Sequence, residues 1–367
     1  MPKRTLLTVS GQKYVVLPYG GFKTFGLSTT PSVPQVAVPF FDRVEDSVSE
    51  PLAMVRGLEE NLKQSGVAGV GALIAAGRFA DSTARAAKTH ELSYEDKISF
   101  PFILFRGERR EEFGILPTLY RPLAHTEPRR HLTLLRELAR RELHLARKIR
   151  FALLKGRRIR LKTDQSRAAA RHFGVASALV DFTFDPNVAA YFAHPRIQED
   201  ERASFDAGKA PLGIIYGFSY SQFGRCFTMQ ATTPGGFGSA AIDFILLENV
   251  IHVPYLAFDE SKKSIQPAVC SIVLPQHFVH RTITLRCVIV PGLERIRAQQ
   301  GMFLEIAGNV IDSYLDAVIL WYVLDFICHK WCFLRTDAQF EVRPSVSDES
   351  LFPTESRLVR AAVWSRE

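Results

Sequence analysis

The sequence predicts an α+β protein with one large domain and a small N-terminal extension. Three patterns favour this class: apolar runs of strand length, a long stretch with helical spacing of apolar residues, and a short strand followed directly by a capped helix. The chain has 367 residues, 47% of them hydrophobic, which is enough for a substantial core. Its five scattered cysteines argue against a disulfide scaffold and indicate a reducing, cytoplasmic compartment.

Residues 1–94 are predicted to form the extension. Alternating apolar residues at 5–9 and 14–17, separated by Ser10-Gly11, predict a β-hairpin. A loop rich in Ser, Thr and Pro follows, and helical spacing predicts helices at 51–64 and 73–88. No apolar stretch approaches the roughly 20 residues that span a bilayer, so we expect no membrane partner.

Residues 95–367 are predicted to form the main domain. The apolar run at 99–105 predicts a strand that ends at Arg106-Gly107-Glu108, with a cation facing a cleft. A long helix is predicted at 131–154. Its inward stripe is expected to consist of apolar residues at three- and four-residue steps, namely Leu132, Leu135, Ala139, Leu143, Ala146, Ile149 and Leu153.

The segment 129–162 is strongly basic. It holds thirteen Lys or Arg residues and two acids, a net charge of +11, so the rest of the chain carries −3 of the total of +8. One interpretation is a solvated helix face, and the other is a surface for nucleic acid or an acidic protein. The residues expected at such a contact are Arg136, Arg140, Arg147, Arg157, Arg158 and Arg160.

The stretch 171–193 contains signals for a helix end, a strand and a second helix. Gly174 is placed to end the first helix, and residues 178–183 predict a short strand. Asp185 and Pro186 suit the N-cap and the first position of the next helix. His172, near a helix end, suits either a contact with backbone carbonyls or a ligand contact.

Several such elements together resemble the FRG domain family, which is named for a Phe-Arg-Gly tripeptide. The tripeptide stands at 105–107, a Leu-Pro-Thr-Leu-Tyr-Arg element at 116–121, and the stretch 171–193 matches the family's long central element. An Arg-Ile-x-x-Gln-x-Gly-x-Phe element at 295–303 and a Leu-Phe-Pro element at 351–355 follow in the family's order. Among the departures, Arg171 stands where the family tends to have Gln.

The order of these elements is similar to that of ADP-ribosyltransferases of the Arg-Ser-Glu type, with a split β-sheet core and flanking helices. The resemblance implies NAD as the cofactor or substrate. Arg106 would then bind the pyrophosphate, a role that suits a planar and permanently charged guanidinium. Asp181 and Thr183 would lie beside the nicotinamide ribose, and Tyr191 would offer a ring face to nicotinamide.

The acid that such a transferase needs is less clearly marked. The matching element contains Gln299 and Gln300, while Glu305 shares a strand face with Gln299 only if the strand continues unbroken. We therefore assign the catalytic roles to Arg106, Thr183, Gln300 and Glu305. The alternative for Arg106 is a structural ion pair with Asp181 or Glu108, and the alternative for Tyr191 is a place in the core.

The segment 328–332 contains two cysteines four residues apart, on one face if it is helical. A second ligand pair is missing and the neighbours are apolar, so we expect buried structural cysteines and no metal. The resulting hypothesis is an NAD-binding, ADP-ribosyltransferase-like effector of bacterial toxin or phage-defence type. The alternative is a non-catalytic FRG module that senses a ligand, in either case with a partner chain of a defence or toxin–antitoxin system.

Overall fold

The structure of the chain is a computed structural model. It describes residues 6–17, 40–45, 53–54, 104–108, 114–121, 130–154, 161–194, 212–218, 228–234, 239–259, 261–288, 290, 293–307, 314–335, 346 and 348–351. The boundary expected at residue 94 and the helices expected at 51–64 and 73–88 lie outside these residues, apart from a helical pair at 53–54.

The described residues form an α+β protein, as the sequence predicts. The strands are β1 (Leu6–Val9), β2 (Gln12–Leu17), β3 (Phe40–Glu45), β4 (Leu104–Glu108), β5 (Val180–Thr183), β6 (Leu212–Phe218), β7 (Thr228–Pro234), β8 (Ser239–Ile245), β9 (Val250–Asp259), β10 (Ser264–Val273), β11 (Thr282–Val288), β12 (Gly301–Ala307) and β13 (His329–Leu334). The helices are α6 (His131–Leu154), α7 (Thr163–His172), α8 (Pro186–Ala193), α11 (Glu294–Ala298), α12 (Tyr314–Ile327) and α13 (Asp348–Leu351), with a 3₁₀ turn, η5 (Gln276–Phe278).

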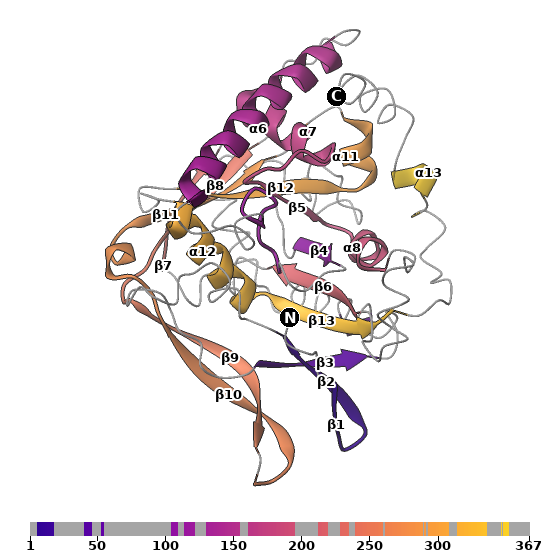
Figure 1. The fold of residues 1–367 in the computed structure, drawn as a ribbon, viewed down its shortest axis with the longest axis vertical. Helices are drawn as coiled ribbons and strands as arrows, with labels where there is room; N and C mark the ends of the chain where they lie inside the picture. The colour runs from indigo at the N-terminus through magenta and orange to yellow at the C-terminus, as the bar shows by residue number, and fades with distance from the viewer. Residues whose placement is uncertain are drawn as a thin grey trace, which may run out of the picture.

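The strands join into one sheet in the order β1-β2-β3-β13-β6-β4-β5-β12-β11-β8-β7 (Figure 1). Among the described pairs, all run antiparallel except β3 with β13. The hairpin of β9 and β10 lies off this path and meets the sheet at the pair Phe41–Leu256. Strand β4, which carries Arg106, therefore lies between β6 and β5 near the middle of the sheet.

The two faces of the sheet around β4 are both covered. On one face, Phe105 packs with three alanines of α8, Ala189, Ala190 and Ala193. On the other face, Leu104 belongs to the main apolar core, which includes Trp321 of α12. Every residue of β6 is buried, as expected for a strand with both faces covered.

The N-terminal hairpin is confirmed, with β1 and β2 joined by a turn at Ser10 and Gly11, both at positive φ. Strand β3 then lies parallel to β13, with Cys332 opposite Val44. Because β13 also pairs with β6, the N-terminal strands continue the sheet of the main domain instead of forming a separate one.

Helix α6 spans the residues predicted for it, 131–154, but its inward stripe is shifted. Leu135, Leu145 and Ala146 are buried, whereas Leu143 is 41% exposed, so its expected place in the stripe is wrong. The acid Glu142 points inward instead and is only 3% exposed. Among the helices that the structure describes, none combines the length and the hydropathy needed to cross a bilayer.

The segment after α7 also follows the local signals. Phe173 caps the helix, and Gly174 takes a left-handed conformation with φ of 92°, which favours glycine. Strand β5 begins at Val180, two residues later than predicted. In α8, the Asp185 side chain accepts a hydrogen bond from the Asn187 amide and Pro186 occupies the first turn, as predicted.

Gly107 fixes how closely α8 approaches β4. A Cβ atom at this position would lie 1.8 Å from the carbonyl oxygen of Ala189 and 2.7 Å from the amide nitrogen of Ala193. Both are backbone atoms of α8, so they move only if the whole helix moves. The glycine of the Phe-Arg-Gly tripeptide is therefore required by packing.

We expect Gly107→Ala to lower the free energy of unfolding by about 3 kcal/mol, because overpacking of this size displaces backbone. Urea unfolding measures the change. Gly301→Ala is a matched control, since the nearest atom to its added Cβ would be 3.5 Å away and no contact is violated. Equal losses in the two variants would contradict the assignment of the cost to the α8 contact.

Candidate functional site

Arg106 lies inside β4, not at its end. The strand continues to Glu108, so the expectation of a cation at the strand end is wrong, and the Arg106 side chain is only 6% exposed. Its Nη1 atom donates to the Asp181 carbonyl oxygen at 2.9 Å and lies 3.0 Å from Asp181 Oδ1. Its Nη2 atom donates to Glu108 Oε2 at 3.1 Å. The structure thus contains both ion pairs, with Asp181 and with Glu108, that were the structural alternative to a ligand-binding role for Arg106.

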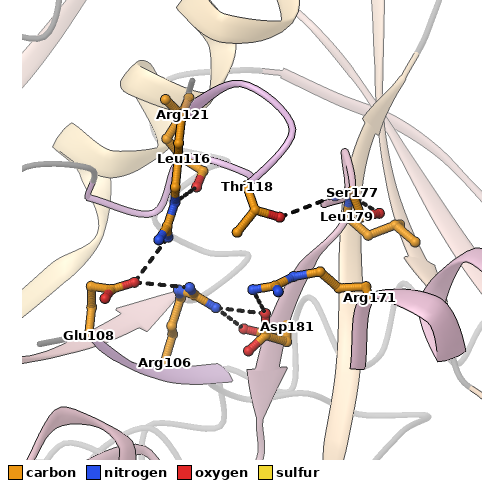
Figure 2. Close-up of polar contacts among 9 residues, drawn as sticks. All are labelled: Arg106, Glu108, Leu116, Thr118, Arg121, Arg171, Ser177, Leu179 and Asp181. Atoms are coloured by element: carbon orange, nitrogen blue, oxygen red, sulfur yellow. Dashed lines mark hydrogen bonds and ion pairs between the residues drawn. The ribbon is translucent and has the colours of Figure 1, made fainter. Parts of the chain in front are cut away.

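Two more arginines join these carboxylates (Figure 2). Arg171, at the end of α7, lies 2.6 Å from Asp181 Oδ1. Arg121 donates to Glu108 Oε2 at 3.0 Å and, through Nε, to the Leu116 carbonyl oxygen. We call these five residues the motif ion cluster: Arg106, Glu108, Arg121, Arg171 and Asp181.

The electrostatics of the motif ion cluster favour the charged forms of Asp181 and Arg106. Burial works against the charged form of Asp181, but the charges of Arg106 and Arg171 outweigh it and hold its pKa well below the usual range. Burial likewise opposes the charge of Arg106, and Asp181 and Glu108 overcome it and raise its pKa. The Asp181 side chain is 45% exposed, so the cluster reaches the surface there.

Thr183 has a different environment from Arg106. Its Oγ1 atom donates to the Gln299 carbonyl oxygen at 2.7 Å and accepts from the Asp185 amide at 3.0 Å. In the register of β4 and β5, Thr183 lies opposite Phe105. Arg106 contacts Asp181 and Glu108 instead, so the described contacts give Arg106 and Thr183 no partner in common.

Gln300 and Glu305 are also separated from each other. Strand β12 begins at Gly301, so Gln299 and Gln300 lie in the preceding turn and share no strand face with Glu305. Gln300 has a positive φ of 44°, and its carbonyl oxygen accepts from the Phe184 amide. The condition under which Glu305 would share a face with Gln299 is not met.

Glu305 belongs to a second set of polar contacts, which we call the Glu142 network: Glu142, Arg167, Ser177 and Glu305. Arg167 joins the two acids, with its Nη1 atom 2.8 Å from Glu305 and its Nε atom 3.1 Å from Glu142. Ser177 Oγ donates to the same Glu142 oxygen, Oε1, at 2.5 Å. The other Glu305 oxygen lies 3.4 Å from Arg286.

The remaining candidates occupy varied positions. Tyr191 is half-buried in α8, where its ring meets Phe192 edge-on and both pack against Val188, Val346 and Leu351. Arg136, Arg140 and Arg147 are exposed on α6. Arg157, Arg158 and Arg160 lie outside the described residues.

The cysteine pair lies in no helix. Cys328 follows α12 and Cys332 lies within β13, so the expected shared helix face is wrong. Both are buried, as predicted, and burial raises the pKa of the Cys328 thiol. The described residues contain no group of three or more side chains able to hold a metal ion.

A comparison with protein families gives one match, between residues 102–202 and the FRG domain. The chain carries an FRG domain. The matched segment spans β4, α6, α7, β5 and α8, and it contains all five members of the motif ion cluster. Neither a search of curated proteins nor a search of solved structures found a match.

Several contacts in the FRG domain were missed by sequence reasoning. Arg121 and Arg171 stand within the two motif elements but were not assigned a role. Glu142 had a clearer signal, since it follows Leu135 by seven residues and so falls on the inward side of α6. An acid at a core position of a basic helix indicates a buried ion pair.

His172 adjoins the motif ion cluster and stays neutral. Its ring lies edge-on to Phe173 and Phe303, and its Nε2 atom is buried without a hydrogen-bond partner among the described residues. Burial and the charge of Arg295 lower the pKa of His172 to about 3. The unfolded chain, with an ordinary histidine pKa of about 6.5, binds this proton more readily than the folded chain does.

We therefore expect His172 to destabilise the fold increasingly as the pH falls from about 6.5 towards 3, with no effect above this window. In His172→Phe, which keeps the ring contacts, the slope of unfolding free energy against pH should drop by up to about 1.4 kcal/mol per unit between pH 4 and 6. Urea titrations at several pH values measure this. A similar change in His144→Gln, which removes an exposed histidine of α6, would contradict the assignment.

For Thr183 we expect a structural effect. Thr183→Val leaves the Gln299 carbonyl and the Asp185 amide without their partner, and should cost roughly 1 to 3 kcal/mol of unfolding free energy. Thr183→Ser keeps the hydroxyl and should cost less than half as much. Chemical denaturation compares the two, and equal losses would show that the methyl group, not the hydroxyl, is what matters.

Proposed function

We propose that this FRG domain binds a phosphate-bearing nucleotide at the motif ion cluster, with NAD as the first ligand to test. In this proposal it acts as a sensing module in a toxin or phage-defence system. One observation carries the proposal. Arginines from three separate motif elements, Arg106, Arg121 and Arg171, meet two carboxylates at a place where Asp181 reaches the surface.

Hydrogen-bond donors of the motif ion cluster that have no acceptor support the binding of an anionic ligand. Among the described residues, the buried Nε atoms of Arg106 and Arg171 have no hydrogen-bond acceptor. A guanidinium carries five donors, and an unmet buried donor costs free energy until an acceptor arrives. Phosphate oxygens suit such donors well, and the ionised Asp181 carboxylate suits a ribose hydroxyl.

The surroundings of Glu305 favour a binding module over a transferase. A transferase of this type needs a free carboxylate that stabilises the positive charge developing on the ribose. Both Glu305 oxygens already contact arginines, Arg167 and Arg286, and the neighbouring turn offers amides at Gln299 and Gln300. Glu305, the acid expected from the motif order, therefore already binds arginines within the Glu142 network.

Asp181 favours a second candidate, the ADP-ribosyltransferase-like enzyme. Its carboxylate is ionised, partly exposed and adjacent to the arginine proposed to bind pyrophosphate. In this version the split-sheet arrangement of the transferases applies and Asp181 replaces the missing acid. The glycosidic bond of NAD breaks, nicotinamide leaves, and the ribose carbon bonds to a nucleophilic atom of the acceptor, a nucleic acid or a protein. Tyr191 and Thr183 would then have the roles implied by the resemblance.

Both versions need a partner for the basic segment 129–162. An acidic partner in the cytoplasm, nucleic acid or protein, fits its charge of +11. A partner chain of a defence or toxin–antitoxin system belongs to the same proposal.

The test uses a matched pair of arginines on α7. Arg167 and Arg171 are four residues apart and equally buried, at 16% and 15% exposure, but one contacts Glu142 and Glu305 and the other Asp181. Lysine keeps the charge and loses the paired donors. We expect Arg171→Lys to weaken NAD binding about tenfold or more in calorimetry, and Arg167→Lys to change it less than about threefold.

Two outcomes would overturn the site assignment: absence of NAD binding by the full chain, or equal weakening in the two variants. A second measurement separates the versions. Free nicotinamide released from NAD by the full chain, and lost in Asp181→Asn, would favour the transferase. NAD binding without nicotinamide release would favour the sensing module.

A further inference from the structure

The outer side of α6 is a dense positive surface. Between residues 130 and 148 six cations are exposed, and Glu137 is the one exposed acid in that range. The cations are Arg130, Arg136, Arg140, Arg141, Arg147 and Lys148. No carboxylate of the described residues contacts Arg136, Arg140 or Arg147. Among the described residues, the side chains of Arg136, Arg140 and Arg147 are therefore exposed and in no ion pair.

The Glu142 network explains why the helix keeps this charge on its outer side. Glu142 is the second acid of the helix, and it is turned inward, where Arg167 and Ser177 hold it. Its negative charge is balanced inside the protein by Arg167 and does not offset the outer cations. The same contacts fix α6 against α7, so the positive face is pre-organised and a partner need not order it (Figure 1).

Four exposed residues form a single stripe along this face: Arg136, Arg140, Leu143 and Arg147, at spacings of four, three and four. With a rise of 1.5 Å per residue, the stripe is about 16 Å long. Three like charges along this length suit a polymer that carries charge along its whole length, such as a nucleic-acid strand with a phosphate about every 3.4 Å of helix axis.

The composition of the face argues against a protein partner. The centres of protein–protein interfaces are depleted in charged residues and enriched in apolar and aromatic ones. Here the described α6 surface offers one exposed apolar side chain, Leu143, among five exposed cations. Arginine is also the residue that binds phosphate oxygens through two parallel hydrogen bonds.

We propose that the outer face of α6 binds the phosphate backbone of a nucleic acid, RNA or DNA, with little dependence on base sequence. The inference rests on the proposed function only for the role of segment 129–162, and it requires neither NAD nor the motif ion cluster. Arg136, Arg140 and Arg147 contact phosphates, and Leu143 lies against the sugars between them.

The experiment measures binding of the full chain, without NAD, to labelled strands of about 20 nucleotides and mixed sequence. Single-stranded RNA, single-stranded DNA and duplex DNA are the three arms, each across a range of salt concentrations. The variant is Arg136→Gln, Arg140→Gln and Arg147→Gln together, since glutamine preserves helix propensity. The control removes the same charge elsewhere, through Lys262→Gln, Arg281→Gln and Arg297→Gln, three exposed cations on other elements.

We expect the α6 variant to bind at least about tenfold more weakly at moderate salt, and the slope of log affinity against log salt to become shallower by roughly 2 to 3. The control should change affinity less than about threefold. The arm bound most tightly identifies the form of nucleic acid. A thermal melt confirms that both variants remain folded, since the substituted side chains are exposed.

Three results would overturn the proposal: equal weakening in the variant and the control, absence of binding to all three nucleic acids at low salt, or tighter binding to poly-glutamate of equal charge. The last result would identify an acidic protein as the partner class. Failure of NAD binding leaves these measurements unaffected, so the two proposals fail separately.

Discussion

The positive charge of Arg106 inside the central sheet is the constraint on which much of this structure depends. A buried cation is costly unless carboxylates surround it, and β4 and β5 provide one each, Glu108 and Asp181. These carboxylates in turn bind Arg121 and Arg171, which ties the turn at 114–121 and the end of α7 to the sheet. Residues from three of the motif elements thus form one electrostatic unit.

This unit is linked to α6 through a short path. The Ser177 amide donates to Thr118 Oγ1 at 3.1 Å (Figure 2). The Ser177 hydroxyl donates to Glu142 of α6. The turn that carries Arg121 therefore contacts the same serine that holds the basic helix. The two proposed contact surfaces, one for a nucleotide and one for nucleic acid, are therefore connected by the hydrogen bonds of Ser177. A change at either surface is transmitted to the other only if these hydrogen bonds have two arrangements.

Local signals in the sequence were sufficient for several elements. The bounds of α6, the Asp185 cap of α8 and the hairpin of β1 and β2 follow from periodicity and capping, which act within a few residues. The class of fold follows from the same patterns. The FRG match covers residues 102–202, which hold the first three motif elements, while the elements at 295–303 and 351–355 lie outside it.

Features set by distant contacts were not predictable in this way. Gly107 and Glu108 suggest a turn, yet β4 continues through them because β6 pairs with both residues. The spacing from Leu135 places Glu142 on the inward side of α6, but its partner Arg167 lies on another helix, which no local pattern indicates. Thr183 and Arg106 stand in successive motif elements, yet the hydroxyl of Thr183 bonds to Gln299 and Asp185, whereas Arg106 bonds to Asp181 and Glu108.

The place of β13 in the sheet also affects how the chain is made. Strand β6 pairs on one side with β13, and Gly217 meets His329, a residue synthesised more than a hundred positions later. At ribosomal rates this gap lasts roughly 5 to 25 s. During that time a strand whose seven residues are all buried in the finished protein has one edge without its partner. Such an apolar edge is open to non-native strand pairing until β13 has been synthesised.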